Sequence, residues 1–212
     1  FLVTEGVIDG IDDIMAVSHC TDPNTSNGQN IVLVSLQPGT HRQLERIRQA
    51  RREFFVGSSC GICGKASIES VFLKVAPIAN SLVLSPEFLD SLPNILRANQ
   101  PKFARTGGLH AAIAVRPDGS FVLGAEDIGR HNAVDKVIGR GLRSGLFPMD
   151  EHVLFVSSRA GFEIVQKALM GRFSAVVSVG AASSLADDLA RRGGLALYSF
   201  VRNGRFNYHR SD

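Results

Sequence analysis

Residues 153–179 read VLFVSSRAGFEIVQKALMGRFSAVVSV and contain one complete strand, helix, strand pattern. Short, continuously apolar runs lie at both ends, at 153–156 and 175–179, and the segment between them places Phe162, Val165 and Leu169 on one side of a helix. Strands of this kind are covered on both faces of a sheet, and their alternation with helices is typical of parallel βαβ units. The chain is therefore predicted to be an α/β protein.

The pattern continues on both sides of this unit. Residues 109–115 and 121–125 are predicted strands joined by a Pro-Asp-Gly turn. A helix that begins near Gly129 carries an apolar stripe made of Ala133, Val134, Val137, Ile138 and Leu142. The segment Ser184-Leu-Ala-Asp187 has the form of a capping box that opens the last helix. Strands at 195–201 and 205–209, with Asn203-Gly204 as the turn, are predicted to close the chain as a hairpin.

Residues 1–100 are predicted to form a smaller, β-rich α+β region. Residues 11–20 and 30–37 are predicted antiparallel strands separated by a turn at 22–28. Residues 1–6 are predicted to be the last turn of a helix capped by Gly6, so we expect a further segment upstream of them. The α/β domain is predicted to cover 101–212, with the boundary inside 101–108.

Two helices are predicted within this smaller region. Residues 40–54 suit a short basic helix. The second begins at Pro86 with Ser85 as its N-cap, and an interruption is predicted at Pro93. It carries Phe88, Leu89 and Leu92 along one face.

Composition bounds the class of protein. The 212 residues are 44% hydrophobic and 20% charged, as in ordinary globular chains. The sequence has no apolar run of about eighteen residues and no recognisable secretory leader, so we expect no membrane span and a cytoplasmic location. The net charge of +3 mildly favours an anionic ligand, and the lack of Lys/Arg clusters argues against nucleic acid as a partner.

The stretch 57–65, GSSCGICGK, holds Cys60 and Cys63, two of the three cysteines. Its glycines let backbone N–H groups turn towards a thiolate, and Lys65 adds positive charge, so a reactive sulfur is expected here. A zinc site is disfavoured because no second Cys pair or close His pair supplies further ligands, so no metal site is predicted. Too few cysteines are present for a secreted disulfide scaffold. Redox catalysis, sulfur transfer and two inert cysteines remain open readings.

Three polar stretches lie where an open α/β sheet usually binds its ligand. Residues 126–132 (EDIGRHN) fall between a predicted strand and a helix, where Arg130, His131 and free N–H groups suit a phosphate, although an ordinary helix cap explains them equally well. Residues 157–161 (SSRAG), with Arg159, occupy the equivalent place after the next strand. Residues 106–110 (TGGLH) precede a strand, and a lone histidine there is more often structural than catalytic. The sequence contains no Walker loop, no GxGxxG and no Gly-x-Ser-x-Gly hydrolase motif.

Several of these stretches, taken together, resemble the FdhD family of formate dehydrogenase accessory sulfurtransferases. They follow the family's order along almost the whole chain, while the family's opening segment is absent. The matching stretches are Thr4-Glu5-Gly6, SCGICG at 59–64, TGGLHAA at 106–112, EDIGRHNAVDK at 126–136 and the ending at 200–206.

The resemblance implies a sulfurtransferase that takes sulfur from a cysteine desulfurase as a persulfide and passes it to the molybdenum bis(guanine dinucleotide) cofactor of formate dehydrogenase. The persulfide-bearing cysteine matches Cys60, with Cys63 as a helper or second carrier. The cofactor-contacting segment matches Phe200, Val201, Arg202, Asn203, Gly204 and Arg205, and GDP is a mimic of the cofactor's nucleotide ends. A plain hairpin is the competing reading of that segment. The oligomeric state stays open, with a homodimer among the options.

The resemblance also implies a cytidine deaminase-like mixed sheet with flanking helices. A zinc deaminase needs His-x-Glu and a later Pro-Cys-x-x-Cys. The comparable junctions here read His131-Asn132-Ala133 and Ser158-Arg159-Ala160-Gly161, so no zinc hydrolysis is expected. Two alternative functions remain: a molybdenum-cofactor binding chaperone without persulfide chemistry, and a dithiol oxidoreductase.

Overall fold

The computed structural model describes residues 1–21, 28–38, 77–78 and 82–209. The cysteine stretch 57–65, the predicted helix 40–54 and most of the predicted turn at 22–28 lie outside these residues. In the part that is described, no helix combines the length and the apolar character that crossing a bilayer requires.

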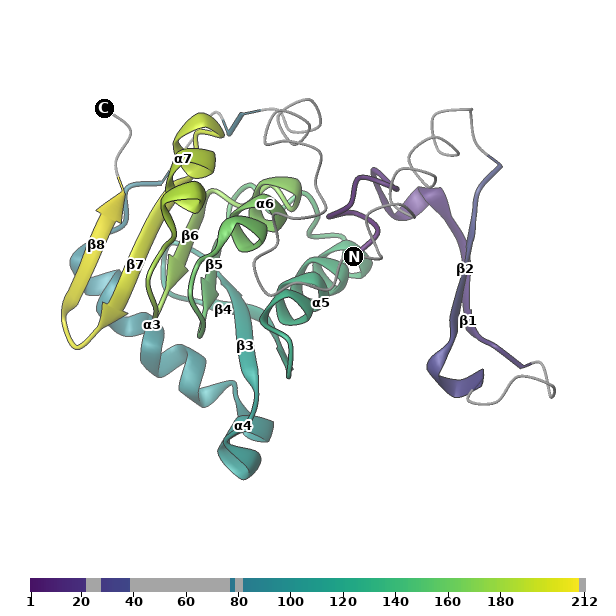
Figure 1. The fold of residues 1–212 in the computed structure, drawn as a ribbon, viewed down its shortest axis with the longest axis horizontal. Helices are drawn as coiled ribbons and strands as arrows, with labels where there is room; N and C mark the ends of the chain where they lie inside the picture. The colour runs from purple at the N-terminus through teal and green to yellow at the C-terminus, as the bar shows by residue number, and fades with distance from the viewer. Residues whose placement is uncertain (22–27, 39–76, 79–81, 210–212) are drawn as a thin grey trace.

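A six-stranded mixed sheet forms the centre of the molecule (Figure 1). Its strand order is β4-β3-β5-β6-β7-β8; β5, β6 and β7 run parallel, and the remaining neighbours pair antiparallel. This confirms the predicted mixed α/β architecture and the two predicted hairpins. The strands are β3 (His110–Val115), β4 (Phe121–Asp127), β5 (Val153–Val156), β6 (Ala175–Ser178), β7 (Ala196–Arg202) and β8 (Arg205–His209).

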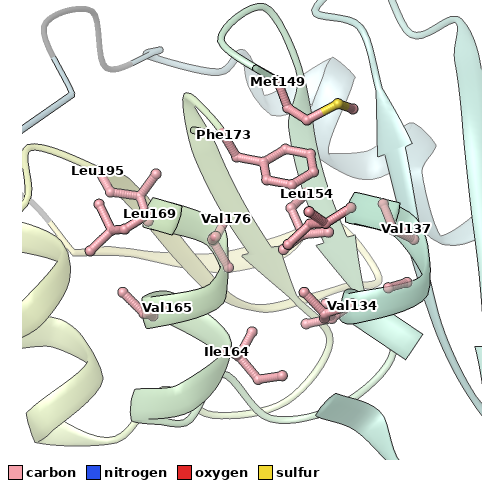
Figure 2. Packing of buried hydrophobic residues seen from close by; sticks show 14 of the residues in the cluster. Val134, Val137, Met149, Leu154, Ile164, Val165, Leu169, Phe173, Val176 and Leu195 are labelled. Atoms are coloured by element: carbon pink, nitrogen blue, oxygen red, sulfur yellow. The ribbon is translucent and has the colours of Figure 1, made fainter. Parts of the chain in front are cut away.

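Helices cover both faces of this sheet. Helices α5 (Arg130–Arg143), α6 (Phe162–Met170) and α7 (Ser184–Arg192) pack on one face, and α3 (Pro86–Ala98) packs on the other. Successive residues of β5 alternate between the two cores: Leu154 and Val156 join the first, and Val153 and Phe155 join the second. Figure 2 shows side chains of α5, α6 and the strands meeting in the first core. The continuous apolar runs are thus explained by burial on both faces.

Two helix boundaries differ from the sequence prediction. The cap of α7 is Ser183, one residue before the predicted Ser184, and its hydroxyl accepts the Ala186 N–H at 3.2 Å; the predicted capping box is wrong, because Ala186 has no polar side chain to return the contact. Helix α3 begins as predicted, with Ser85 accepting the Phe88 N–H at 3.2 Å, but it continues through Pro93. Proline removes one helical hydrogen bond, and burial of Leu89, Leu92 and Leu96 against the sheet offsets that loss.

The N-terminal residues form a separate ribbon. Strands β1 (Ile14–His19) and β2 (Val32–Leu36) pair antiparallel, as predicted, and extend away from the six-stranded sheet (Figure 1). Short 3-10 helices, η1 (Ile11–Asp13) and η2 (Gly28–Asn30), precede them. Upstream, Gly6 adopts the predicted left-handed conformation (φ 70°) at the end of a turn, and Val7 and Ile8 enter the first core.

The chain returns from the cysteine-bearing stretch next to the C-terminal end of α7. The Ile78 N–H donates to the Gly193 carbonyl at 2.8 Å. Gly194 beside it has φ 66°, and a Cβ on it would lie 2.7 Å from the Ile78 oxygen, so this crossing requires glycine. The predicted domain boundary at 101–108 remains a prediction, and this stretch contains the short helix α4 (Pro101–Thr106), which ends at the left-handed Gly107.

Candidate functional site: a basic cavity at one edge of the sheet

One edge of the sheet collects all the polar stretches singled out above. The parallel strands β5, β6 and β7 end at this edge. Because β3 runs antiparallel to β5, its first residue His110 lies there too, opposite Asp127 at the end of β4. The turn between β7 and β8 is at the same edge. The topology therefore brings the predicted ligand-binding stretches to one side of the molecule, as expected for an open α/β sheet.

A cavity of about 370 Å³ opens at this edge, between the first turns of α5, α6 and α7. It brings together Arg130, His131 and Arg159, which the sequence analysis had selected from two separate stretches. Their assignment to a ligand remains a prediction. The remaining lining residues are Ala160, Gly161, Phe162, Glu163, Ala181, Ala182, Ser183, Ser184 and Leu185.

The cavity favours anions. Two guanidinium groups, from Arg130 and Arg159, face one carboxylate, that of Glu163. Helices α5 and α6 begin at Gly129 and Gly161, which supply no side-chain cap for the first-turn N–H groups. The positive ends of three helix dipoles converge on the same space. This combination of arginines and helix N-termini is suited to phosphate or a comparable oxyanion.

His131 and Glu163 contact each other in the lining of the cavity. The Nε2 atom of His131 lies 2.8 Å from an Oε2 of Glu163, and both side chains are about 30% exposed (31% and 27%). The pair joins the first turn of α5 to the first turn of α6. Glu163 was not predicted as a site residue, and its place in the first turn of a helix gave the only sequence signal.

The pKa of His110 is lowered by its surroundings at this edge. Burial first, and then the electrostatic effects of Arg130 and His131, lower the pKa of His110 below its ordinary value. The imidazole of His110 is therefore neutral at pH 7. The structural role of His110 stays a prediction.

The two carboxylates of the predicted stretch 126–132 bind the N-terminal ends of helices and not a ligand. Glu126 caps α4, accepting the N–H groups of Lys102 at 3.0 Å and Phe103 at 2.6 Å. Asp127 accepts the Gly129 N–H at 2.8 Å and also contacts Asn132 and Lys136, which fixes the start of α5. The stretch thus divides into carboxylates that hold the helices and basic side chains that line the cavity.

The serines before Arg159 are also structural. Ser157 accepts the Ala111 N–H at 2.9 Å and so ties β5 to β3. The Ser158 hydroxyl donates to the Arg159 carbonyl at 3.1 Å. Neither contact leads into the cavity, and Arg159 is the residue of this stretch that carries charge to it.

The hairpin turn between β7 and β8 has an irregular backbone. Phe200 and Asn203 have positive φ (57° and 52°), and the pairing of β7 with β8 is shifted between Ser199 and Arg202. Arg202 and Arg205 are exposed, whereas Val201 is buried against α3. Non-glycine residues at positive φ are held there by their surroundings and occur often at functional sites.

A carboxylate of α3 holds the tip of this hairpin. The Gly204 N–H donates to Oδ1 of Asp90 at 3.0 Å, and both residues line a small hollow together with Arg202 and Arg205. No residue of 200–205 lines the larger cavity. The structure therefore gives two basic surfaces at one edge of the sheet. No local sequence pattern pairs Asp90 with a turn 114 residues away.

Ser199 of β7, His209 of β8 and Asp187 of α7 form a Ser–His–Asp arrangement that is structural. Ser199 Oγ lies 2.8 Å from Nε2 of His209, and Nδ1 of His209 lies 3.4 Å from Asp187. A hydrolytic triad needs a nucleophile that a substrate can reach. Ser199 is only 1% exposed, so this group ties β8 to β7 and α7 instead.

The fold and the basic edge define an α/β protein suited to binding an anionic ligand. A family model described as the FdhD/NarQ family matches residues 1–212, and the chain belongs to this family. It is 43% identical over 216 residues to a protein named sulfur carrier protein FdhD from Anaeromyxobacter dehalogenans strain 2CP-1, covering 99% of this chain and 75% of the relative. A protein of the same name from Streptomyces avermitilis is 44% identical over 214 residues, with the same shares covered.

A solved structure supports the architecture independently. The chain matches a crystal structure described as a formate dehydrogenase accessory protein from Desulfotalea psychrophila, with a TM-score of 0.70 and 22% identity. The match covers 99% of this chain and 74% of the other. At this identity the likeness establishes the shared fold.

Proposed function

We propose that this protein is a sulfur carrier that supports the maturation of formate dehydrogenase. In this proposal Cys60 receives sulfur from a cysteine desulfurase and delivers it to the molybdenum bis(guanine dinucleotide) cofactor, which is the cargo. The observation that carries the proposal is the pair of basic surfaces at one sheet edge, in a chain whose relatives are named sulfur carrier proteins. Transfer is assigned to the cytoplasm, and a homodimer remains compatible with it.

The sulfur step balances without an external oxidant. The Cys60 thiolate attacks the outer sulfur of a donor persulfide, forming Cys60–S–SH and releasing the donor's thiolate. The Cys63 thiolate can then attack Sγ of Cys60, forming a Cys60–Cys63 disulfide and releasing HS⁻ to the cargo. A dithiol reductant returns the pair to its starting state. Both cysteines lie outside the residues that the structure describes.

The nucleotide ends of the cargo carry diphosphates, and the described residues offer two places for them. Arg130 and Arg159 supply guanidinium groups beside the helix N-termini of the cavity. Arg202 and Arg205 stand on both sides of the Asn203-Gly204 turn, where an exposed backbone permits close approach. Phe200, 39% exposed, offers an aromatic face to a guanine base. We assign His131 and Val201 to support these surfaces.

The relation to the cytidine deaminase fold belongs to the same proposal. A mixed sheet with β3 and β4 as an antiparallel pair beside three parallel strands, covered by helices on both faces, supports it. In this proposal, the junctions after β4 and β5, which carry Arg130, His131 and Arg159, correspond to the junctions that hold zinc ligands in deaminases. We infer that an inherited ligand edge serves anion binding here.

Mass spectrometry tests the sulfur step. The protein is incubated with a cysteine desulfurase and cysteine, then digested without reductant and searched for peptides heavier by one sulfur atom. We expect the added sulfur on Cys60 in the native protein and in Cys63→Ser, and none in Cys60→Ser. Cys20→Ser serves as the matched control, because Cys20 is the third cysteine and lies outside the motif. Folded protein that takes no sulfur on Cys60 overturns the proposal.

Calorimetry with GDP separates a sulfur carrier from a dithiol oxidoreductase. A guanine-bearing cargo predicts GDP binding that the Cys60→Ser variant retains and that Arg205→Met weakens. A simple oxidoreductase predicts no GDP binding and dithiol-dependent reduction of insulin. A chaperone without persulfide chemistry predicts GDP binding together with activation of formate dehydrogenase by Cys60→Ser.

A further inference from the structure

Two polar contacts are stacked between α5 and α6. His131 and Asp135 lie one turn apart on α5, and Glu163 and Lys167 lie one turn apart on α6. The first contact, His131 to Glu163, lines the cavity. The second lies one turn behind it, where Nζ of Lys167 contacts both carboxylate oxygens of Asp135 at 2.9 Å. The helices that shape the cavity are therefore joined at two successive levels.

The second contact is buried and fully engaged. The side chains of Lys167 and Asp135 are 8% and 11% exposed. Lys167 also donates to the Thr4 hydroxyl at 3.1 Å, approaches Glu5 at 3.8 Å and lies 5.6 Å from the centre of the Phe1 ring. Thr4 in turn lies 2.7 Å from Oδ1 of Asp135 and is 1% exposed. A buried lysine and aspartate require this degree of pairing.

This cluster also attaches the N-terminal segment to the helices. Thr4 and Glu5 are followed by Val7 and Ile8 in the first core and then by the β1–β2 ribbon, after which the chain leads to the cysteine stretch. Figure 1 shows the N-terminal segment beside α5, and α5 beside α6. The cluster formed by Thr4, Asp135 and Lys167, which we call the Lys167 cluster, thus connects three separate segments.

We propose that the Lys167 cluster sets the spacing of the first turns of α5 and α6 and thereby the anion affinity of the cavity. Thr4, Asp135 and Lys167 are positioning residues, since none of them lines the cavity. A buried salt bridge contributes little net stability to the fold, because apolar residues of similar volume in its place often stabilise the folded protein as well or better. A buried ionic contact instead fixes one geometry, and anion sites depend on donors held to about 0.5 Å. The proposal rests on the proposed function for its ligand.

Two variants and one control test the positioning role. Thr4→Val keeps the shape of the side chain and removes its hydroxyl, and Lys167→Met removes the ammonium from the cluster. Arg192→Met is the control, since Arg192 forms an exposed ion pair with Asp188 on α7. GDP affinity is measured by calorimetry at 15 °C, together with the melting temperature and the NMR signals of the His131 ring.

We expect Thr4→Val and Lys167→Met to weaken GDP binding by about twofold to thirtyfold, with displaced His131 ring signals. Arg192→Met is expected to change neither. Folded variants with a lower melting temperature but native GDP affinity overturn the proposal. Should Lys167→Met fail to fold, Thr4→Val decides alone. If the native protein does not bind GDP, the proposed ligand is wrong, and the positioning role is then judged on the His131 signals: displaced signals support it and unchanged signals overturn it.

Discussion

The carboxylate of Asp90 on α3 accepts a hydrogen bond from the backbone N–H of Gly204, 3.0 Å away in the turn between β7 and β8. The contact places a negative charge beside Arg202 and Arg205, the side chains proposed to bind phosphate. Asp90 therefore holds the turn in place and also competes with an anionic ligand for the arginines. Charge and hydrogen bonding at this position can be separated by mutation.

Asp90→Asn keeps an oxygen acceptor for Gly204 and removes the charge. We expect GDP to bind this variant about 1.4-fold to fivefold more tightly, because an exposed charge of this kind contributes roughly 0.2–1 kcal/mol. Asp90→Ala removes the acceptor as well, so the turn loses its attachment and GDP binding weakens below that of Asp90→Asn. Calorimetry of both variants checks the order, and equal affinities would contradict it.

Phe200 should contribute to binding at a cost in backbone energy. Its positive φ is unfavourable for a side chain with a Cβ, and relief of such strain is worth about 1 kcal/mol. In Phe200→Gly, relief of the backbone strain should offset much of the stability lost with the packing of the ring, so we expect the free energy of unfolding to change by less than about 1 kcal/mol. The variant should also bind GDP more weakly, because it lacks the aromatic face. Arg172→Gly is the control, since Arg172 also has a positive φ (64°), lines neither basic surface, and should leave GDP binding unchanged when replaced. Urea denaturation and calorimetry provide the two measurements.

Gly180 offers a way to move Arg159 without removing its charge. A Cβ on Gly180 would lie 2.9 Å from Cγ of Arg159 and 3.1 Å from its backbone N, so Gly180→Ala must displace Arg159. We expect GDP binding to weaken at least about threefold, together with a loss of stability of about 1–3 kcal/mol from overpacking. Gly139→Ala on α5 meets no atom within 4 Å and should keep native affinity. Native affinity in Gly180→Ala would show that Arg159 does not contact the ligand.

His152 should make stability depend on pH. It is 5% exposed, and neither ring nitrogen has a hydrogen-bond partner among the residues described by the structure. Burial first, and then the positive charge of Arg116, lower the pKa of His152 from its usual 6.5. Below pH 6.5, His152 therefore binds a proton in the unfolded chain but stays neutral in the folded protein. The free energy of unfolding consequently falls as the pH falls through this range.

His152→Leu removes this proton linkage and an unsatisfied buried group. We expect the variant to be more stable by about 1 kcal/mol at pH 7.5 and by a larger margin at pH 5.5. Urea denaturation at both pH values checks the prediction. His110 contributes a pH dependence of the same sign, so some dependence remains in the variant. A variant with a smaller advantage at pH 5.5 than at pH 7.5 contradicts the assignment.

The sequence predicted the regular elements well where burial leaves a pattern. A sheet covered on both faces was predicted from the apolar runs at 153–156 and 175–179 and from the apolar stripe on α5. These patterns are informative because apolar spacing reflects which surfaces are buried. Arg130, His131 and Arg159 were selected because βα junctions meet at one edge of such a sheet, and their role in binding stays a prediction. Their convergence on one cavity followed from topology, while its shape and volume did not.

What the sequence could not predict depends on contacts between distant residues. Glu126 lies in the stretch expected to bind phosphate, but α4 places two free N–H groups beside it. Pro93 was expected to interrupt α3, and packing on the sheet overrides this local preference. Lys167 contacts Asp135 and Thr4, which lie far from it in the sequence, so no local motif predicts this cluster.

In the proposed function, the hydrogen bond between Ile78 and Gly193 fixes one end of the chain segment that leads back to Cys60. Helix α7 has nine residues, about 14 Å of helix, and its two ends meet this anchor and the cavity. The eighteen peptide steps from Cys60 to Ile78 span at most about 65 Å, several times that length. In the proposed function, a sulfur atom carried by Cys60 therefore stays covalently attached to the anchor, on a length of chain sufficient to reach the cavity. Handover within one molecule should then be first order and insensitive to dilution.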